Sequence, residues 1–215
     1  MTGKAGEVAV DIDVRPLRGV ALEVALDDVA RLRIEVFRAY PYLYDGDAEY
    51  ERRYLQAYKD SPDAILIGAY HNGHLVGAAT GTPMEDHADD FAAALAGQSL
   101  DGQETGSQAP DLTHIFYCAE SVLLPQYRGR GIGHAFFDAR ENHARALGCD
   151  VSVFCSVLRP ADHPLRPQGY SPLDGFWRGR GYAPLAGAIA HFAWKDTDQP
   201  DETDHDLQLW MRRLG

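Results

Sequence analysis

The chain has 215 residues, of which 45% are hydrophobic and 24% are charged, and its formal net charge at pH 7 is −12. This length favours a single domain, and this composition excludes wholesale disorder. The acidic balance argues against nonspecific binding to nucleic acid or to an anionic membrane. No run of about 18 apolar residues is present, so the sequence predicts no membrane span.

The N-terminal residues and the cysteines indicate a cytoplasmic protein. The first 14 residues are interrupted by acidic side chains and lack the apolar core of a signal peptide. Cys118, Cys149 and Cys155 form neither an even set nor a CxxC pair, which is not the pattern of a disulfide framework or a zinc site. We therefore expect reduced thiols and a cytoplasmic location.

The first quarter of the chain has the pattern of a strand and two helices. Residues 7–17 alternate apolar and polar side chains, which is typical of a strand. A helical pattern begins at Asp27 and Asp28, whose charges suit a helix N-terminus, and it ends before Pro41. Residues 49–58 place tyrosines four apart, which predicts a second, amphipathic helix.

A hairpin and an acidic insert come next. Two apolar runs, residues 63–70 and 74–81, flank the pair Asn72-Gly73, and Asn-Gly is the preferred pair for a tight hairpin turn. Residues 84–112 form the insert, which we expect to be flexible apart from one or two helical turns in its middle.

The second half alternates strands and helices. The pattern predicts a strand buried on both faces, a basic glycine-rich loop, a helix, a strand, a short helix and two last strands. Together with the first half, this predicts one mixed α/β domain, residues 1–215, around a central sheet. The segments concerned are residues 114–125, 126–133, 132–147, 151–157, 173–178, 186–196 and 206–214.

The segment that carries chemistry is RGRGIG, Arg128 to Gly133, between a strand and a helix. Glycines there expose several backbone N–H groups in one direction, and with the positive end of the helix these form an anion site. No Lys-Ser or Lys-Thr pair follows, and the third glycine of a dinucleotide-binding pattern is missing. From the residues alone, a plain turn without a ligand is the alternative.

The stretch ESVLLPQYRGRGIG resembles motif A of the GNAT superfamily of acyl-CoA N-acyltransferases, in a bacterial-type subgroup. The family pattern Q/R-x-x-G-x-G/A is matched by Arg128, Gly131 and Gly133. Residues 176–182, FWRGRGY, resemble the late LYxKxGF signature of the family. The resemblance covers nearly the whole chain apart from the insert and a proline-rich loop.

This resemblance implies a fold, a co-substrate and a binding site. The fold is a mixed, mostly antiparallel twisted sheet of about seven strands, with flanking helices and splayed fourth and fifth strands. Acetyl-CoA would insert its pantetheine arm into the splay. Backbone groups of Val122, Leu123 and Leu124 would bond the pantetheine, and the Leu123 N–H would polarise the thioester carbonyl. The pyrophosphate would bind the loop residues Arg128, Gly129, Arg130, Gly131, Ile132, Gly133 and His134.

Acyl transfer to an amine needs a base, because a free alkylammonium has a pKa of about 10.4. Our candidate is Glu120, a charged residue within an apolar run and three residues before Leu123. The carboxylate would act directly or through water. The alternative is a structural carboxylate, partly exposed or paired with an arginine in the loops.

An acid would protonate the leaving thiolate, and here the chain departs from the family. Trp177 stands where the family signature has tyrosine, and an indole N–H cannot serve as a proton acid. Tyr170 is our candidate for this role, with Cys155 and solvent as alternatives.

The acceptor site is predicted from two regions. Tyr42 and Tyr44 lie in the region that walls the acceptor site in the family, and aromatic rings bind ammonium groups by cation–π contact; packing is the alternative. Arg159 and His163 lie in the stiff proline-rich loop. They are candidates for the acceptor wall or for contacts to coenzyme phosphate, with a structural loop as the alternative.

We therefore expect an acyl-CoA-dependent N-acetyltransferase. It would use acetyl-CoA, without a metal, to acetylate a primary amine of a small molecule by direct attack in a ternary complex. The alternatives are an acyl-CoA-binding sensor with little turnover and a protein N-acetyltransferase. The expected partners include no nucleic acid and no membrane, and a homodimer could form along the edge of the last strands.

Overall fold

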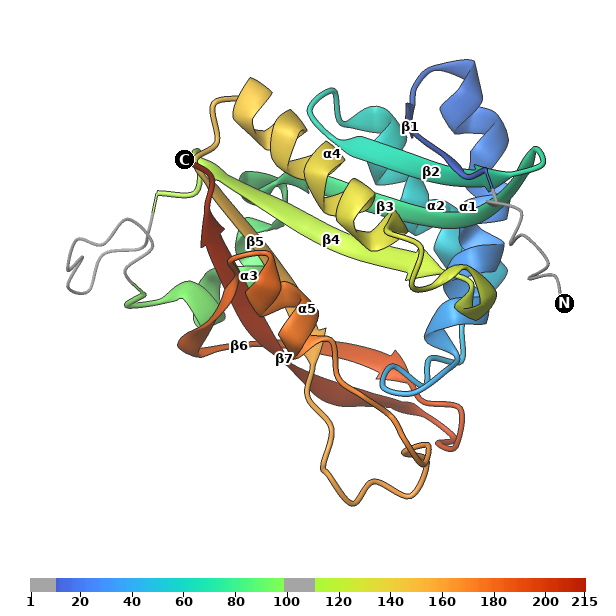
Figure 1. Ribbon diagram of the computed structural model, residues 1–215. Coiled ribbons are helices and arrows are strands. Elements are labelled where there is room, and N and C mark those ends of the chain that lie inside the picture. Colours follow the sequence, from blue (N-terminus) through green and yellow to red (C-terminus); the bar gives the residue numbers. More distant parts are fainter. Residues whose placement is uncertain (1–10, 99–110) are drawn as a thin grey trace, which may run out of the picture.

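Seven strands form one sheet in the order β1-β2-β3-β4-β5-β7-β6 (Figure 1). The computed structural model describes residues 11–98 and 111–215. Every neighbouring pair of strands is antiparallel except β4 and β5, which are parallel. This confirms the predicted mixed sheet. The strands are β1 (Asp13–Leu17), β2 (Ile65–His71), β3 (His74–Pro83), β4 (Ile115–Leu123), β5 (Val151–Val157), β6 (Ala183–Lys195) and β7 (Glu202–Arg213).

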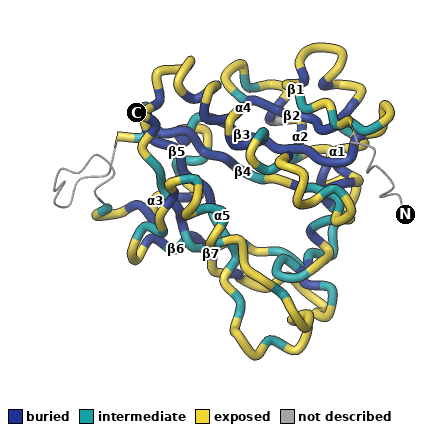
Figure 2. The backbone as a smooth tube through the Cα atoms, in the orientation of Figure 1, coloured by how far each residue is buried: buried dark blue, intermediate teal, exposed yellow. Residues whose placement is uncertain are grey.

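Helices cover both faces of the sheet, and the buried residues follow the strands between them (Figure 2). One core joins α4 and the aromatic side chains of α5 to the sheet. On the other face, α1 and α2 form a second core with β1–β4, and α3 forms a third with β4–β7. In the described residues no helix is both long and apolar enough to cross a membrane. The helices are α1 (Val20–Phe37), α2 (Ala48–Asp60), α3 (Ala88–Leu95), α4 (Ile132–Ala146) and α5 (Asp174–Gly179).

Helix α1 begins earlier than its sequence pattern predicted. It starts at Val20, so Asp27 and Asp28 lie exposed in its middle rather than at its N-terminus. The reason is that Leu22 and Ala25 continue the apolar stripe towards the N-terminus and are buried. Burial of this stripe outweighs the preference of acidic residues for the first turn of a helix.

The predicted hairpin is confirmed, and the first part of the acidic insert is folded. Asn72 and Gly73 both have positive φ, 50° and 81°, as a tight primed turn requires. In the insert, α3 buries Phe91 and Leu95 against the third core. The prediction of a flexible segment falls mostly on residues 99–110, which lie outside the described residues.

Strands β4 and β5 pair over a short stretch and then separate. Ile115, Phe116 and Tyr117 pair with Val151, Ser152 and Val153, and the ladder stops there. On its other edge β4 carries a bulge: Thr82 pairs with Tyr117 but Thr80 with Glu120, so β4 has one extra residue. A bulge bends its strand and increases the local twist, which accounts for the splay.

The bulge also decides which face Glu120 occupies. Ile115 and Tyr117 belong to the core under α3, whereas Phe116 and Cys118 face α4. Strict alternation would therefore place residue 120 on the α4 face. The extra residue reverses the alternation, and Glu120 lies on the same face as α1 and α2.

Gly81 and Arg140 hold the bulge from two sides. A Cβ on Gly81 would lie 2.5 Å from the Phe116 ring, so only glycine fits opposite the extra residue. Arg140 of α4 is 1% exposed. Its Nη1 donates to the carbonyl oxygens of Thr80, at 3.2 Å, and of Glu120, at 2.9 Å. The guanidinium thus satisfies two backbone acceptors beside the bulge.

We predict that Arg140→Met lowers the free energy of unfolding by about 2–4 kcal/mol, because two buried carbonyl oxygens lose a charged donor. Urea denaturation followed by circular dichroism measures this. Arg145→Met, at an exposed position of the same helix, is the matched control and should change stability by no more than about 0.5 kcal/mol. Equal effects of the two substitutions would remove Arg140 from this role.

Candidate active site

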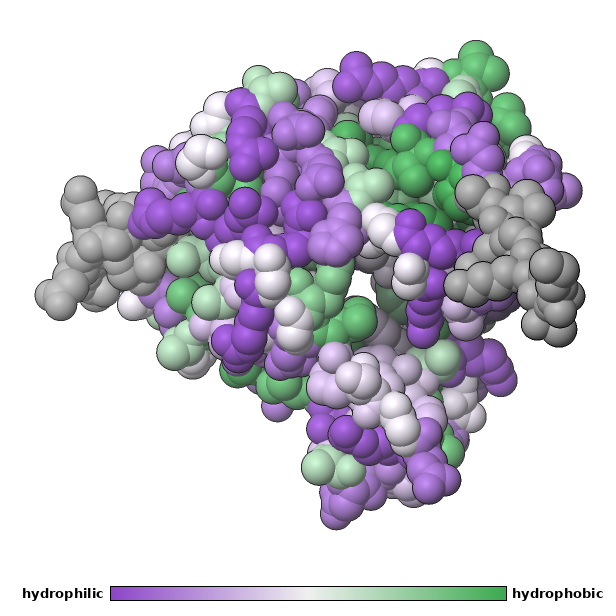
Figure 3. Space-filling model, viewed as in Figure 1, coloured by the Kyte–Doolittle hydropathy of each residue, from purple (hydrophilic) through white to green (hydrophobic). Residues whose placement is uncertain are grey.

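The gap between β4 and β5 opens into a cavity of about 1090 Å³. Figure 3 shows an opening between the part of the molecule that carries α4 and the projecting loop of residues 158–173. Val122, Leu124, Arg130, Tyr44 and His163 are predicted site residues that do not line this cavity. The predicted residues that do line it are Tyr42, Glu120, Leu123, Arg128, Gly129, Gly131, Ile132, Gly133, His134, Arg159 and Tyr170.

The glycine-rich loop presents free amides at the start of α4. Gly129 and Gly131 have φ of 74° and 81°, a left-handed conformation that favours glycine. The Arg128 amide donates to Pro125 O, and the next backbone bond of this region runs from Ala135 to Gly131 O. In the described chain no backbone acceptor receives the amides between them, from Gly129 to His134. Six free N–H groups at a positive helix end are an arrangement that suits a bound anion.

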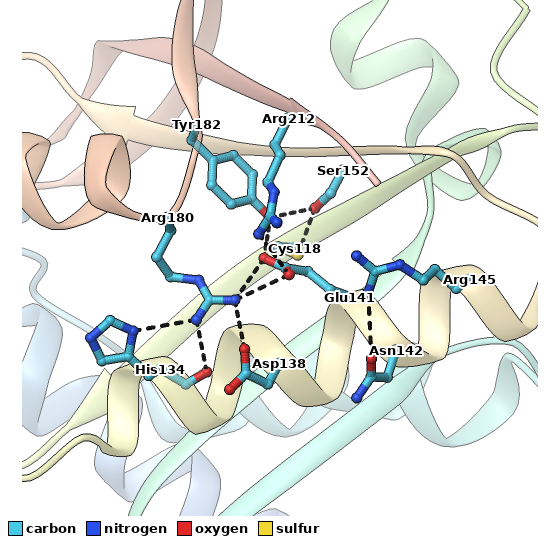
Figure 4. Close-up of polar contacts among 10 residues, drawn as sticks. All are labelled: Cys118, His134, Asp138, Glu141, Asn142, Arg145, Ser152, Arg180, Tyr182 and Arg212. Atoms are coloured by element: carbon cyan, nitrogen blue, oxygen red, sulfur yellow. Dashed lines mark hydrogen bonds and ion pairs between the residues drawn. The ribbon is translucent and has the colours of Figure 1, made fainter. Parts of the chain in front are cut away.

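A polar network centred on the buried Glu141 fixes the first turns of α4 (Figure 4). Arg180, just after α5, donates to the carbonyl oxygen of His134 and to the carboxylates of Asp138 and Glu141. Glu141 is buried and also accepts bonds from Arg212 of β7 and from the Tyr182 hydroxyl. Arg180 and Tyr182 belong to the late signature FWRGRGY, so that signature serves to hold in place the helix that follows the glycine-rich loop.

The edge of β4 offers one of the three predicted backbone positions to the cavity. The Leu124 N–H donates to Val76 O at 3.0 Å, so that amide is already used by β3. Alternate residues of a strand direct their backbone groups to opposite neighbours. The backbone N–H of Val122 therefore also points to β3. The N–H of Leu123 points the other way, into the gap where β4 and β5 are unpaired.

Glu120 lines the cavity and is paired with an arginine behind it. Its side chain is 8% exposed, and its Oε2 contacts Arg33 of α1 and lies 3.4 Å from the Tyr54 hydroxyl. Arg33 also contacts Glu51 of α2 through Nε. The other carboxylate oxygen, Glu120 Oε1, has no hydrogen-bond partner in the part of the chain that the structure describes.

Arg33 and Glu51 were missed by the sequence analysis. Arg33 lies four residues after Val29 and within the apolar stripe of α1. A charged side chain on a buried stripe needs a buried partner, so this position carried a usable signal. Nothing local in the sequence marks Glu51.

Aromatic rings form the wall opposite the loop. Tyr42 packs on Phe37, with ring centroids 4.4 Å apart, and Tyr170 meets Tyr40 edge-on at 4.7 Å. Burial raises the pKa of Tyr42 and of Tyr170, so both phenols keep their protons at neutral pH. Tyr44 lies instead against Glu51; burial and that carboxylate raise its pKa.

Arg159 supports the cavity wall with bonds that occupy its guanidinium. It donates to the carbonyl oxygens of Pro41 and Tyr42 and makes a two-pronged ion pair with Asp196. These bonds join the loop after α1 to the end of β6. His163 contacts the Tyr40 ring, with centroids 5.8 Å apart.

Two further side chains in the cavity bear on the chemistry. Trp177 packs on Phe154 and Trp210. Cys155 of β5 is mostly buried, and burial raises the pKa of its thiol. Among the described residues, no group of three or more His, Cys, Asp or Glu side chains is placed to hold a metal ion.

The splayed strands, the free amides and the late signature together define an acyl-CoA-dependent acyltransferase. Residues 27–167 match the acetyltransferase (GNAT) family. The chain therefore belongs to the GNAT acetyltransferase family, as the sequence resemblance predicted.

Solved structures of low sequence identity share this fold. YncA of Salmonella typhimurium, solved with its cofactor acetyl-CoA, is 12% identical with a TM-score of 0.56, over 95% of this chain and 94% of that chain. A ribosomal-protein-alanine N-acetyltransferase of Brucella melitensis is 13% identical with a TM-score of 0.57, over 94% of this chain and 99% of that chain. An aminoglycoside 6′-N-acetyltransferase complexed with coenzyme A is 12% identical with a TM-score of 0.56, over 94% of this chain and 97% of that chain. No curated protein matches the chain at a significant level.

The residues of this chain fit acetyl-CoA. The amides from Gly129 to His134 are free and lie at a positive helix end, which suits a diphosphate. The unpaired edge of β4 offers the Leu123 N–H, which suits the amide groups of a pantetheine arm. When bound, the co-substrate supplies an activated acetyl group.

We predict that Gly131→Ala weakens acetyl-CoA binding about 10-fold, because an alanine disfavours the left-handed φ that aims the loop amides. Isothermal titration calorimetry measures the affinity. Gly148→Ala is the matched control: that glycine has φ of 86°, equally open surroundings and a place at the far end of α4. Both variants should lose similar stability, and a similar loss of affinity in both would contradict the assignment of the loop.

Proposed function

We propose that the protein acetylates the primary amine of a small molecule by direct attack on acetyl-CoA in a ternary complex. The observation that carries this proposal is the position of Glu120: a buried carboxylate with one oxygen unpartnered, in a cavity whose other walls are the Leu123 edge and a set of aromatic rings. A carboxylate and aromatic rings around one space suit an ammonium group.

Glu120 is the proposed base. An alkylammonium must lose a proton before it attacks, and the free Oε1 can accept that proton directly or through one water molecule. Arg33 and Tyr54 hold the other oxygen, so the carboxylate is fixed in one orientation. A fixed orientation reduces the entropic cost of reaching the reactive geometry.

The Leu123 N–H is the proposed oxyanion donor. It belongs to a strand held on its other edge by β3, so its direction does not depend on a mobile side chain. A preorganised donor of this kind stabilises the charge that develops on the carbonyl oxygen. Tyr170 is the proposed acid for the leaving thiolate, since its phenol keeps its proton at neutral pH and lines the cavity.

A small acceptor is favoured by the walls around the aromatic end of the cavity. Hydrogen bonds from Arg159 to Pro41, Tyr42 and Asp196 join the loop after β5, the loop after α1 and the end of β6 there. Residues 158–173 project beside the opening (Figure 3). A joined wall of this kind limits access for a folded protein more than for a free amine.

The test begins with calorimetric titration of the protein with acetyl-CoA and with free CoA, followed by a panel of small primary amines and peptides. We expect micromolar binding of acetyl-CoA and transfer to a small amine. Glu120→Gln should lower kcat at least 10-fold with little change in acetyl-CoA affinity, the size typical of a general base. Binding without transfer would favour the sensor alternative, and transfer to peptides alone would favour a protein N-acetyltransferase.

We predict that incubation with acetyl-CoA in the absence of an amine leaves the intact mass of the protein unchanged. The only cysteine in the described chain that lines the cavity without being fully buried is Cys155, and burial raises the pKa of its thiol. That thiol stays protonated at neutral pH and is a poor nucleophile. A mass increase of one acetyl group that Cys155→Ala abolishes would instead indicate an acyl-enzyme.

The three free thiols support a reducing, cytoplasmic location. A homodimer remains a proposal. In the observed strand order β6 is the edge next to β7, so it is the strand of the last pair that could join a second copy.

A further inference from the structure

Behind the aromatic wall of the cavity, one arginine is shared by two carboxylates. Arg33 reaches Glu51 through Nε and Glu120 through Nη1. The side chains of Arg33 and Glu120 are each 8% exposed, and that of Glu51 is 0% exposed. One guanidinium and two carboxyl groups thus meet in a buried cluster built from α1, α2 and β4.

The two carboxylates differ in what they face. Glu120 lines the cavity and Glu51 does not. If Arg33 served only to neutralise a buried charge, one carboxylate would be enough, and a second buried carboxylate adds a desolvation cost. Neutralising Glu120 therefore does not explain why a second carboxylate, that of Glu51, is buried against Arg33.

We propose that Glu51 is a positioning residue that tunes Glu120 through Arg33. By sharing the arginine, Glu51 keeps Glu120 fixed while leaving it more basic than an exclusive ion pair would. This inference rests on the proposed role of Glu120 as the base.

The contact with Arg33 is the main charge interaction of the Glu120 carboxylate, because the other groups around it are neutral or contact its backbone. From α2, Tyr54 lies over the Arg33 guanidinium, 4.3 Å from its centre, and contacts Glu120 Oε2. Behind it, burial raises the pKa of Tyr58 well above its usual value, so that phenol is neutral. From α4, Arg140 contacts the backbone oxygen of Glu120. Burial by itself lowers the pKa of Arg33, but Tyr54 and Glu51 raise it, and Arg33 stays charged.

The sign of the effect follows from these positions. A nearby anion raises the pKa of a carboxyl group and a nearby cation lowers it. Replacing Glu51 by glutamine removes the anion and leaves Arg33 to Glu120 alone, so both changes lower the pKa of Glu120. A less basic carboxylate accepts the proton of the acceptor ammonium less readily.

The experiment compares Glu51→Gln with Glu49→Gln. Both substitutions remove one negative charge from α2, but Glu49 is exposed and lies outside the cluster. For Glu51→Gln we expect kcat at neutral pH to fall about 3- to 10-fold and the acid limb of the kcat profile to move to lower pH by roughly half a unit to one unit. Acetyl-CoA affinity should not change, and Glu49→Gln should behave as the wild type.

A second readout does not depend on activity. In protein labelled with ¹³C at the glutamate carboxyl carbon, the Glu120 signal is assigned by its loss in Glu120→Gln and is titrated by NMR. Its pKa should be lower in Glu51→Gln than in the wild type and unchanged in Glu49→Gln. An unchanged Glu120 pKa and pH profile in folded Glu51→Gln would overturn the inference.

The proposed function and this inference fail in different ways. If the wild type binds acetyl-CoA but transfers to no amine, the proposed function fails, while the NMR titration still decides whether Glu51 tunes Glu120. If the wild type is active, and Glu51→Gln shows the same pH profile and the same Glu120 pKa as the wild type, only the inference fails. Arg33→Lys keeps the charge but lacks a fork that can hold both carboxylates, so it should lower kcat at least 10-fold with acetyl-CoA affinity retained.

Discussion

One extra residue in β4 organises the site. Because the register shifts between Tyr117 and Glu120, the strand bends away from β5 after three paired residues and leaves its edge open. The same shift turns the Glu120 side chain towards α1 and α2. A bulge therefore accounts for both the open edge of β4, where we propose that the co-substrate binds, and the direction of the proposed base, which a regular strand could not provide together.

Two buried arginines stabilise this irregular strand from opposite faces, and both act on Glu120. Arg140 of α4 donates to its carbonyl oxygen, and Arg33 of α1 pairs with its carboxylate. Arg140 gives the two carbonyl oxygens beside the bulge a charged donor, and Arg33 gives a carboxylate removed from solvent a cation, so each arginine stabilises a buried acceptor. Glu120 is thereby fixed at its backbone and at its side chain, and in the described residues its other carboxylate oxygen has no hydrogen-bond partner.

The sequence predicted those parts of the molecule that depend on short-range patterns. The Asn72-Gly73 turn, the glycine-rich loop and the order of strands and helices all follow from neighbouring residues. The start of α1, the bulge and the pairings of Arg33 and Arg159 were not predicted. Each depends on contacts between segments far apart in the chain, such as the bond from Arg159 to Pro41, and alternation alone places Glu120 on the wrong face.

This difference in what the sequence predicts follows the chemistry of the two proposed halves of the site: the donor half, for acetyl-CoA, and the acceptor half, for the amine. The donor half is made mainly of backbone: free amides of the loop and the edge of β4, which require glycine at a few positions and little else. The proposed acceptor half is made of side chains, among them Tyr42 and the Arg33 cluster, each held by distant partners. Chains that are 12–13% identical can therefore share the fold and still differ in the acceptor half. The acceptor of this protein consequently has to be inferred from its own charges and rings, and the carboxylate pair that shares Arg33 is the feature that we propose to set the proton chemistry there.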